Sequence, residues 1–472
     1  TAGWNARLLG NIARLMTAVE QVCAELGLGA PVVVIRADGT AMPAGAARLR
    51  PVETILSGPA ASIEGGLALA KTAEAIVVDV GGTTTDIGLA VGGSPAVRDE
   101  VALVGGHTLA VRAVQEYTVA LGGDSHVQFT SDGIVIGPRR VVPVSVLARQ
   151  YPAVTDQLQT PRYRDDDSTL CQPADVFALA DPTRQAGPAD DPAVRALAGG
   201  PLSRQKLAKA LGVIHPSLIR TNELIGSGQI VLSALTPTDC LVALGRADLG
   251  EKAAAQAAVA LYARRAGRSP EEFAEAVLEK FVETLSLAVL KARLIAGGIR
   301  NDRMLVDPEA SSLIRAALNG SDHMPVHMTL KLKEPIAAVG APAAAYIPSA
   351  GKRLGTRTIV PRAAGVAAAV GAALAGLAVR STATICPTLN QRFSVHSEEG
   401  RYEFDTLDDA KEFLERHMGQ IIRQRACQFG MEAAQVAVQF TDRTAELLGA
   451  AGIEPMWLEC RVVAEAVQSM AE

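Results

Sequence analysis

The chain has 472 residues, of which 49% are apolar and 20% are charged. This composition excludes an intrinsically disordered chain, and the length predicts two or more domains. The net charge of −5, without a long basic run, excludes an electrostatic preference for nucleic acid or for an anionic membrane. Six widely spaced cysteines form no CxxC pair, so reduced thiols in a cytoplasmic protein are expected rather than zinc or disulfides.

The ends of the chain and its most apolar stretch bear on localisation. The longest uncharged run, 363–379, is short and consists mainly of Ala and Gly, so we expect a buried helix and no membrane span. No signal peptide is recognisable. The chain opens with Thr1 directly in a helical pattern, and we therefore expect that an N-terminal portion is missing.

The first 150 residues predict a regular series of elements. Apolar residues at helical spacing indicate a helix over 4–27, a Val/Ile run indicates a strand over 31–36, and Ser57-Gly58-Pro59 opens a second helix through Ala70. The clearest hairpin lies at 75–90, where two apolar runs flank a Gly-Gly-Thr-Thr-Thr turn. A Gly-rich turn at 122–126 and another hairpin around 131–133 follow.

The remainder predicts an insertion and a C-terminal appendage. Abundant prolines over 138–205 favour an irregular, loop-rich segment. Residues 236–298 are expected to be helical, with capping signatures at Thr236 and Ser269. Short strands and turns are expected over 299–360, then a small-residue helix over 363–379. The tail predicts strand 392–404, helix 407–429 and strands 435–441 and 456–467.

The segment from Asp79 to Asp86 carries the strongest chemical signal. Gly81 and Gly82 would let the backbone approach a ligand closely, and successive amides in such a turn suit phosphate oxygens. The hydroxyls of Thr83, Thr84 and Thr85 would add donors. Asp79 and Asp86, below the turn, could hold hydrated Mg²⁺, which needs few carboxylates. The alternative is an ordinary Gly-Gly hairpin with solvated acids.

Three weaker features support the interpretation of the hairpin as a phosphate site only through their order along the chain. Gly340, Ala341 and Pro342 follow a short apolar strand and could face a flat base or ribose. Two Ala/Gly-rich helices, 59–70 and 363–377, could approach each other closely. Taken singly, a plain loop and ordinary core packing are the better explanations of these features.

The order is small-residue helix, hairpin, strand with Gly turn, small-residue helix, and it resembles the second half of the actin-like ATPase fold of actin, sugar kinases and heat-shock chaperones. That resemblance implies an α/β, ribonuclease-H-like lobe in which the hairpin grips phosphate and the Gly turn holds adenosine. Because the corresponding first-half hairpin is not in the sequence, it also implies that the N-terminal lobe is missing.

A closer resemblance is to the hydantoinase/oxoprolinase family. It rests on the residues at 34–40, 54–61, 78–87, 121–125, 235–239 and 336–348, above all Ser57-Gly58-Pro59-Ala60 followed by Asp79-Val80-Gly81-Gly82-Thr83-Thr84-Thr85-Asp86. The resemblance implies an enzyme that uses ATP and Mg²⁺ to open a cyclic amide, of the hydantoin or 5-oxoproline type, by phosphorylating the amide oxygen. It also implies a second hydantoinase-type subunit and an oligomer.

One stretch departs from the family pattern. Many members carry Asp-x-His before a Gly-Gly-Gly-Ser turn, whereas this chain has Gln115 and Tyr117 before Gly122-Gly123-Asp124-Ser125-His126. Asp124 and His126 are candidates for the displaced catalytic role, and a plain polar turn is the alternative. Two rival functions therefore stay open: an ATP-gated chaperone or reactivating factor, and a non-catalytic subunit of a family carboxylase or hydrolase complex.

The sequence as a whole predicts five segments. Residues 1–70 would form an interlobe region, 71–150 the first part of the ATPase lobe, 151–300 a loop-rich and helical insertion, 301–385 the second part of the lobe, and 386–472 a small α+β C-terminal domain.

Overall fold

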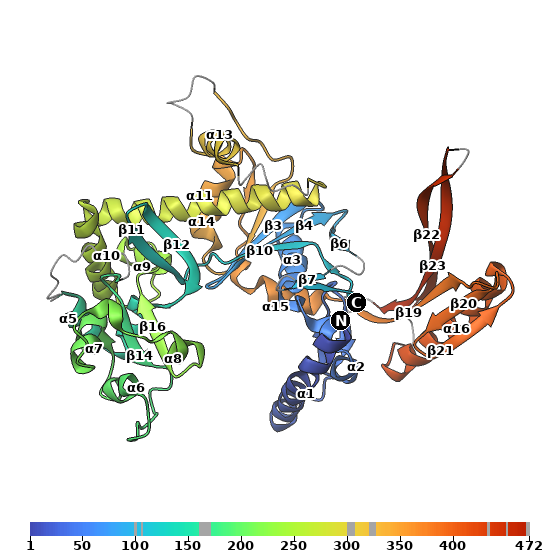
Figure 1. Ribbon diagram of the computed structural model, residues 1–472, viewed down its shortest axis with the longest axis horizontal. Coiled ribbons are helices and arrows are strands. Elements are labelled where there is room, and N and C mark those ends of the chain that lie inside the picture. Colours follow the sequence, from blue (N-terminus) through green and yellow to red (C-terminus); the bar gives the residue numbers. More distant parts are fainter. Residues whose placement is uncertain are drawn as a thin grey trace. The chain divides into compact units, whose positions relative to one another are not determined.

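The computed structural model describes residues 1–98, 102–104, 107–159, 171–299, 307–320, 327–431, 435–449 and 452–468. The chain forms two compact units, each assembled from separate segments (Figure 1). Unit 1 comprises 1–68, 95–114 and 368–472, and unit 2 comprises 69–94 and 115–367. Among the described helices, none has both the length and the apolar character needed to cross a bilayer.

Unit 2 is built on a mixed sheet with the strand order β10-β4-β3-β17-β18. Its strands are β3 (Ala75–Val80), β4 (Thr85–Val91), β10 (Glu116–Val119), β17 (Ile336–Val339) and β18 (Thr358–Ile359). Strands β3, β17 and β18 run parallel, whereas β4 and β10 are antiparallel to their neighbours. The prediction of an α/β protein is confirmed, and the 75–90 hairpin lies at the centre of this sheet.

One face of the sheet packs on long helices. Ile76, Val78 and Val80 of β3 belong to the main core together with residues of α11 (Pro270–Ala296) and α14 (Ala343–Arg353). Phe281 and Tyr346 stack between these two helices with ring centroids 4.0 Å apart. Alternate residues of a strand point to opposite faces, so Asp79 and Asp86 lie on the other face.

The rest of unit 2 is more regular than the prolines suggested. The predicted irregular segment supplies three strands of the four-stranded sheet β13-β16-β14-β15, with short helices around it, and residues 160–170 lie outside the described part. The bounds are β13 (Val142–Pro143), α4 (Val144–Gln150), α5 (Ala153–Gln159), β14 (Val176–Leu179), α6 (Pro192–Leu197), β15 (Leu202–Ser203), α7 (Arg204–Ala210), η2 (Pro216–Leu218), α8 (Asn222–Gly226) and β16 (Ile230–Ala234). The segment is more regular than predicted, and Pro192 begins α6, a position where a missing N–H costs nothing.

The helical stretch after 236 is confirmed. It contains α9 (Pro237–Ala243), α10 (Lys252–Ala266) and α11, and both predicted capping boxes form, at Thr236 and at Ser269. The expectation of only strands and turns over 299–360 was wrong, because α13 (Pro308–Asn319) and α14 are helices. Unit 2 also holds β5 (Ser94–Pro95), the predicted hairpin of β11 (Ser125–Thr130) and β12 (Gly133–Arg140), and η3 (Ala364–Val366).

Unit 1 contains a seven-stranded sheet with the path β1-β2-β19-β20-β21, joined by β23 on β19 and β22 on β23. The bounds are β1 (Val33–Ile35), β2 (Ala41–Pro43), β19 (Leu377–Pro387), β20 (Phe393–Ser397), β21 (Gly400–Phe404), β22 (Gln435–Gly449) and β23 (Gly452–Gln468). Helix α16 (Leu407–Gln428) buries Leu414, Met418 and Ile422 in the core that this sheet forms. The predicted strand over 392–404 is a two-stranded hairpin, and β22–β23 forms a long ribbon (Figure 1).

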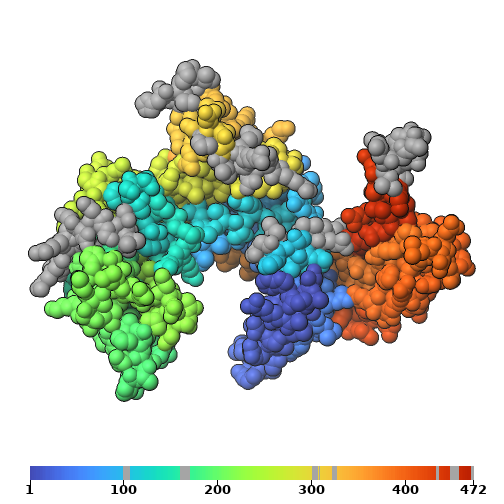
Figure 2. All heavy atoms as spheres, viewed as in Figure 1, coloured from blue at the N-terminus to red at the C-terminus, as the bar shows by residue number. Residues whose placement is uncertain are grey.

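The N-terminal part of unit 1 is mainly helical. It holds α1 (Ala2–Glu25), α2 (Ala44–Leu49), η1 (Pro51–Thr54) and α3 (Ser57–Ala70). The separate segment 95–114 of unit 1 adds the short strands β6 (Val97–Arg98), β7 (Ala102–Val104), β8 (His107–Leu109) and β9 (Ala113–Val114). In α1, all of which is described, Met16 is the one buried residue, and Figure 2 shows much of this helix, in dark blue, at the visible surface.

The two small-residue helices do pack closely. The second, α15 (Ala367–Leu374), is shorter than predicted because the chain enters β19 at Leu377. A Cβ atom added to Gly371 would lie 1.9 Å from the Ala61 carbonyl oxygen and 2.7 Å from the Gly65 nitrogen. Backbone therefore meets backbone at this crossing, which only glycine permits.

Candidate functional site

The β3–β4 hairpin places two carboxylates opposite each other. Asp79 and Asp86 are register partners, as are Val80 and Thr85 directly below the turn. The turn is closed by a 2.9 Å hydrogen bond from the Gly81 amide to the Thr84 carbonyl. The sequence thus brings an acid pair to the base of a glycine turn, as predicted.

A second loop binds the carbonyl groups of this turn. The amides of Gly123 and Asp124 donate to the Gly81 and Gly82 carbonyls at 3.0 and 2.8 Å. A Cβ atom on Gly122 would lie 2.4 Å from the Gly82 oxygen, so no side chain fits there. The predicted Gly122-Gly123 turn is therefore a support for the hairpin.

The direction of these carbonyls determines where the amides of the turn point. In a trans peptide the N–H group points opposite to the C=O of the same peptide plane. Because the Gly81 and Gly82 carbonyls face the second loop, the Gly82 and Thr83 amides both point away from it. Two successive amides on one side of a turn form a small concavity that suits anionic oxygens.

Within the hairpin, the three threonines differ. Thr83 is exposed at the tip and Thr84 is half-buried. Thr85 is fully buried, and its hydroxyl donates to the Leu121 carbonyl at 2.7 Å. The expectation that all three hydroxyls face a ligand therefore does not hold for Thr85, which fixes the second loop.

The third predicted turn reaches the same edge of the sheet. Val339 is the parallel partner of Asp79, and Gly340 follows it with φ at +92°. A Cβ atom there would lie 2.1 Å from the Val80 oxygen and 2.6 Å from Asp79 Oδ1. Glycine is therefore required at 340 both by backbone conformation and by space.

Ala341 and Pro342 continue this turn into helix α14. Pro342 stands at the helix N-cap, and its Cγ would lie 3.9 Å from a Cβ atom on Gly123. Thr238 links the same region, because its amide and hydroxyl both donate to the Gly123 carbonyl at 3.0 and 2.8 Å. Three turns far apart in sequence thus converge at the carboxyl ends of β3 and β17, where ligands bind in open α/β sheets.

A third carboxylate, Glu116, joins the acid pair and was missed in the sequence. Strand β10 pairs Thr118 with Asp86 and Glu116 with Gly88, so all these residues share one face of the sheet. Thr118 donates to Asp86 at 2.7 Å. In the sequence, the alternation of Glu116, Tyr117 and Thr118 could have indicated a strand with two polar side chains on one face. That these side chains face the acid pair depends on the pairing with β4, which no local pattern specifies.

The acid cluster of Asp79, Asp86 and Glu116 is electrostatically unusual. Burial, followed by repulsion from Asp86, raises the pKa of Glu116 to about 8. Burial and the charge of Asp79 also raise the pKa of Asp86, against the effect of the Thr118 hydrogen bond. Glu116 Oε2 is buried without a hydrogen-bond partner among the described residues. Burial and the neighbouring carboxylate of Asp86 therefore favour the protonated form of Glu116.

Asp79 and Asp86 fit the requirements of Mg²⁺ only when a ligand supplies further oxygens. Among the described residues, no group of three or more His, Cys, Asp or Glu side chains is arranged to hold a metal ion. Mg²⁺ commonly binds through one or two carboxylates, waters and substrate phosphates. The paired aspartates beside the amide concavity match that mode rather than an all-protein cage.

Asp124 lies over the hairpin and is half-buried. Its Oδ2 atom accepts from Arg140 at 3.1 Å and would lie 2.7 Å from a Cβ atom on Gly82. It therefore ties the second loop to β12 and lies beside Gly82.

His126 has a different environment. Its Nε2 atom lies 3.5 Å from Asp175 Oδ1, and Asp175 also accepts from Arg204 at 2.9 Å. Burial opposes ionisation of Asp175, but His126 and Arg204 outweigh it and lower its pKa. The structure thus places His126 in a buried ion network of the β14–α7 region and not with the three turns.

Residues 115–117, where the sequence departs from the family pattern, alternate between the two faces of the sheet. Tyr117 pairs with Ile87 on the core face, and the Lys291 ammonium lies 5.7 Å from its ring centroid. Glu116 and Thr118, one residue to either side, face the acid cluster instead.

Residues 1–157 match the family model described as hydantoinase/oxoprolinase. A curated relative, caprolactamase subunit alpha from Pseudomonas jessenii, is 30% identical over 139 residues, which is 29% of this chain and 20% of the relative.

Two solved structures resemble the whole chain in fold. Nucleotide-free acetone carboxylase has a TM-score of 0.50 at 14% identity and covers 96% of this chain and 55% of its own. The ATP-dependent caprolactamase from Pseudomonas jessenii has a TM-score of 0.50 at 16% identity and covers 99% of this chain and 57% of its own. The chain thus spans little more than half the length of these neighbours.

The matched region contains the β3–β4 hairpin, the second loop and the acid cluster. The resemblance predicted from the motifs at 54–61 and 78–87 is confirmed by the match of residues 1–157 to the hydantoinase/oxoprolinase family model.

Proposed function

We propose that this chain is the nucleotide-binding part of an ATP-dependent enzyme that opens a cyclic amide. The observation that carries the proposal is the convergence of the hairpin, the second loop and the Gly340 turn at one sheet edge beside Asp79 and Asp86. The family match and the ATP dependence named for caprolactamase support the nucleotide.

In this proposal each turn has a separate task. The Gly82 and Thr83 amides bind phosphate oxygens. These amides point away from the second loop, because that loop binds the Gly81 and Gly82 carbonyls on the other side. Asp79 and Asp86 orient Mg²⁺ and its waters. Gly340, Ala341 and Pro342 present a flat surface of small side chains to the adenosine.

Bound ATP would supply the phosphoryl group that activates the amide carbonyl toward water. The residues of the chain would contribute by holding the reacting groups in line, which lowers the activation barrier. The amides of Gly123 and Asp124 hold the phosphate turn through the Gly81 and Gly82 carbonyls.

The proposal extends to the architecture and the assembly. The β10-β4-β3-β17-β18 sheet is proposed as a ribonuclease-H-like lobe of the actin type, with the 151–300 segment as an insertion and 386–472 as an appendage. A partner subunit is proposed because the curated relative is named as a subunit. The hydantoin or 5-oxoproline ring remains the proposed substrate class.

The test is an ATPase assay with hydantoin, 5-oxoproline or caprolactam added in turn. The proposal predicts phosphate release that one ring compound stimulates, together with the ring-opened product. Phosphate release that no ring compound affects would favour the chaperone-like alternative. Absence of both binding and turnover would leave the non-catalytic subunit.

A further inference from the structure

A chain of direct hydrogen bonds leads from helix α9 to the hairpin turn of the proposed nucleotide site. Thr238 lies at its start, because its amide and its hydroxyl both donate to the Gly123 carbonyl, at 3.0 and 2.8 Å. The amide of the next residue, Asp124, donates to the Gly82 carbonyl of the turn at 2.8 Å. Thr238 is thus linked to the turn through a single peptide group of the second loop.

The two hydrogen bonds lie at opposite ends of one peptide plane. The Gly123 carbonyl and the Asp124 amide belong to the same trans peptide, so they point in opposite directions. The Gly82 carbonyl and the Thr83 amide are related in the same way, and the Thr83 amide is one of the two that are proposed to bind phosphate. Holding the Gly123 carbonyl at Thr238 therefore helps to fix the direction of the Thr83 amide.

Hydrogen bonds in such a chain also strengthen one another. A donor at a carbonyl oxygen polarises the peptide and makes the N–H at its other end a better donor. Thr238 supplies two donors to one carbonyl, from its amide and from its hydroxyl. The Thr83 amide, at the far end of the chain, is therefore a stronger donor to an anionic oxygen than an isolated turn amide would be.

Thr238 is itself held in place and is almost fully buried. It is the second residue of α9, whose first turn is fixed by the capping box of Thr236 and Asp239. Asp239 accepts from the Ser145 hydroxyl at 2.6 Å and so joins α9 to the start of α4. Only 8% of Thr238 is exposed, and a Cβ atom on Gly123 would lie 2.8 Å from its hydroxyl oxygen. Because the contact is buried, solvent does not readily replace the hydroxyl when it is removed.

We propose that Thr238 is a positioning residue for nucleotide binding, which sets the direction of a phosphate-binding amide through the Gly123–Asp124 peptide. The inference rests on the proposed function of the hairpin turn and extends it to α9, a helix of the 151–300 segment. The affinity of the site for phosphate then depends on how α9 is seated, and α4 takes part through Asp239.

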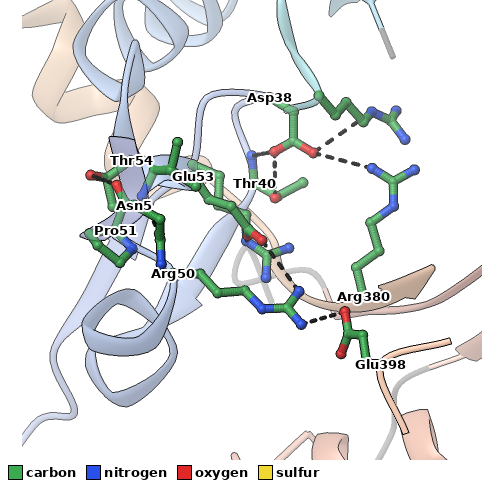
Figure 3. Close-up of polar contacts among 12 residues, drawn as sticks. Asn5, Asp38, Thr40, Arg50, Pro51, Glu53, Thr54, Arg380 and Glu398 are labelled. Carbon is green, nitrogen blue, oxygen red and sulfur yellow. Dashed lines mark hydrogen bonds and ion pairs between the residues drawn. The ribbon is translucent and has the colours of Figure 1, made fainter. Parts of the chain in front are cut away.

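The test is calorimetric titration with the Mg²⁺ complex of a non-hydrolysable ATP analogue. Thr238→Val keeps the shape of the side chain and removes the hydroxyl, whereas Thr238→Ser keeps the hydroxyl. Two controls remove a threonine hydroxyl that donates to a backbone carbonyl elsewhere. Thr356→Val acts at the Glu334 carbonyl in unit 2, at 2.8 Å, and Thr54→Val acts at the Pro51 carbonyl in unit 1, at 2.7 Å (Figure 3).

Thr238→Val is expected to weaken nucleotide binding about three- to tenfold, which is the effect of losing one hydrogen bond. Thr238→Ser and both controls are expected to bind as wild type does. Serine lacks the methyl group, so rescue by Thr238→Ser assigns the effect to the hydroxyl and not to packing.

Equal binding by wild type and Thr238→Val would overturn this inference and leave the proposed nucleotide site intact. Weakening of the same size in Thr238→Ser or in Thr356→Val would also overturn it, because packing or general loosening would then be the cause. No binding by wild type would contradict the proposed function itself, and this inference with it. If Thr238→Val fails to fold, Thr238→Ala, which also lacks the hydroxyl, is compared with Thr238→Ser instead.

Discussion

Glu116 sets a pH dependence of stability that a single substitution can reveal. The pKa of Glu116 is raised from 4.5 to about 8 in the folded chain, so the folded state keeps a proton that the unfolded state releases. Stability from this group therefore falls as pH rises from about 4.5 to 8. Glu116→Gln removes that dependence and is expected to raise the free energy of unfolding at pH 8 by about 1–3 kcal/mol relative to wild type.

The measurement is urea unfolding at pH 6.5 and at pH 8, above the pKa of about 6 of the buried Asp239. An equal pH dependence in wild type and Glu116→Gln would show that Glu116 is not a buried acid. Asp132→Asn, an exposed turn residue, serves as the control.

Asp239 is a second buried acid with a purely structural task. It accepts hydrogen bonds from the Ser145 amide and hydroxyl at 2.9 and 2.6 Å and from the Thr236 amide and hydroxyl at 3.0 and 2.8 Å. Asp239 thus joins the start of α4 to the start of α9, which carries Thr238 beside Gly123.

Asp239→Asn would turn an amide donor toward some of these donors, and we expect a loss of about 2–4 kcal/mol in the free energy of unfolding. Ser269→Ala, at the exposed capping box of α11, is expected to cost about 1 kcal/mol. Thermal or urea unfolding of both variants checks the order, and a smaller loss in Asp239→Asn than in Ser269→Ala would contradict it.

At the scale of elements, the crossing of α3 and α15 is the most demanding contact. A methyl group on Gly371 meets the α3 backbone at Ala61 and Gly65, which cannot yield without moving the helix. We expect Gly371→Ala to destabilise unit 1 by about 1–3 kcal/mol, as overpacking with a backbone shift does. Gly58→Ala, where the added Cβ has open space, is the control for a helical glycine. Equal stability of Gly371→Ala and Gly58→Ala would show that the helices do not cross there.

Local patterns predicted some elements and not others, for a physical reason. The hairpin at 75–90 and the capping boxes at Thr236 and Ser269 were predictable because turn residues and caps act within a few positions. The small sheet of β13–β16 was not, since its strands pair across tens of residues through tertiary contacts.

The candidate site divides in the same way. Asp79, Gly81 and Gly82 are marked by one contiguous motif. Glu116 joins the acid cluster only through the register of its strand with Gly88. His126 lies apart from the three turns because its side chain faces Asp175, which is distant in sequence.

At the scale of the whole molecule, the central claim is that the three turns bind a nucleotide. Calorimetric titration with Mg-ATP of wild type, Asp79→Asn and the control Asp132→Asn tests it most directly. We predict that wild type and Asp132→Asn bind alike and that Asp79→Asn binds at least tenfold more weakly with an unchanged melting temperature. Identical binding by all three proteins, or no binding by wild type, would contradict the account.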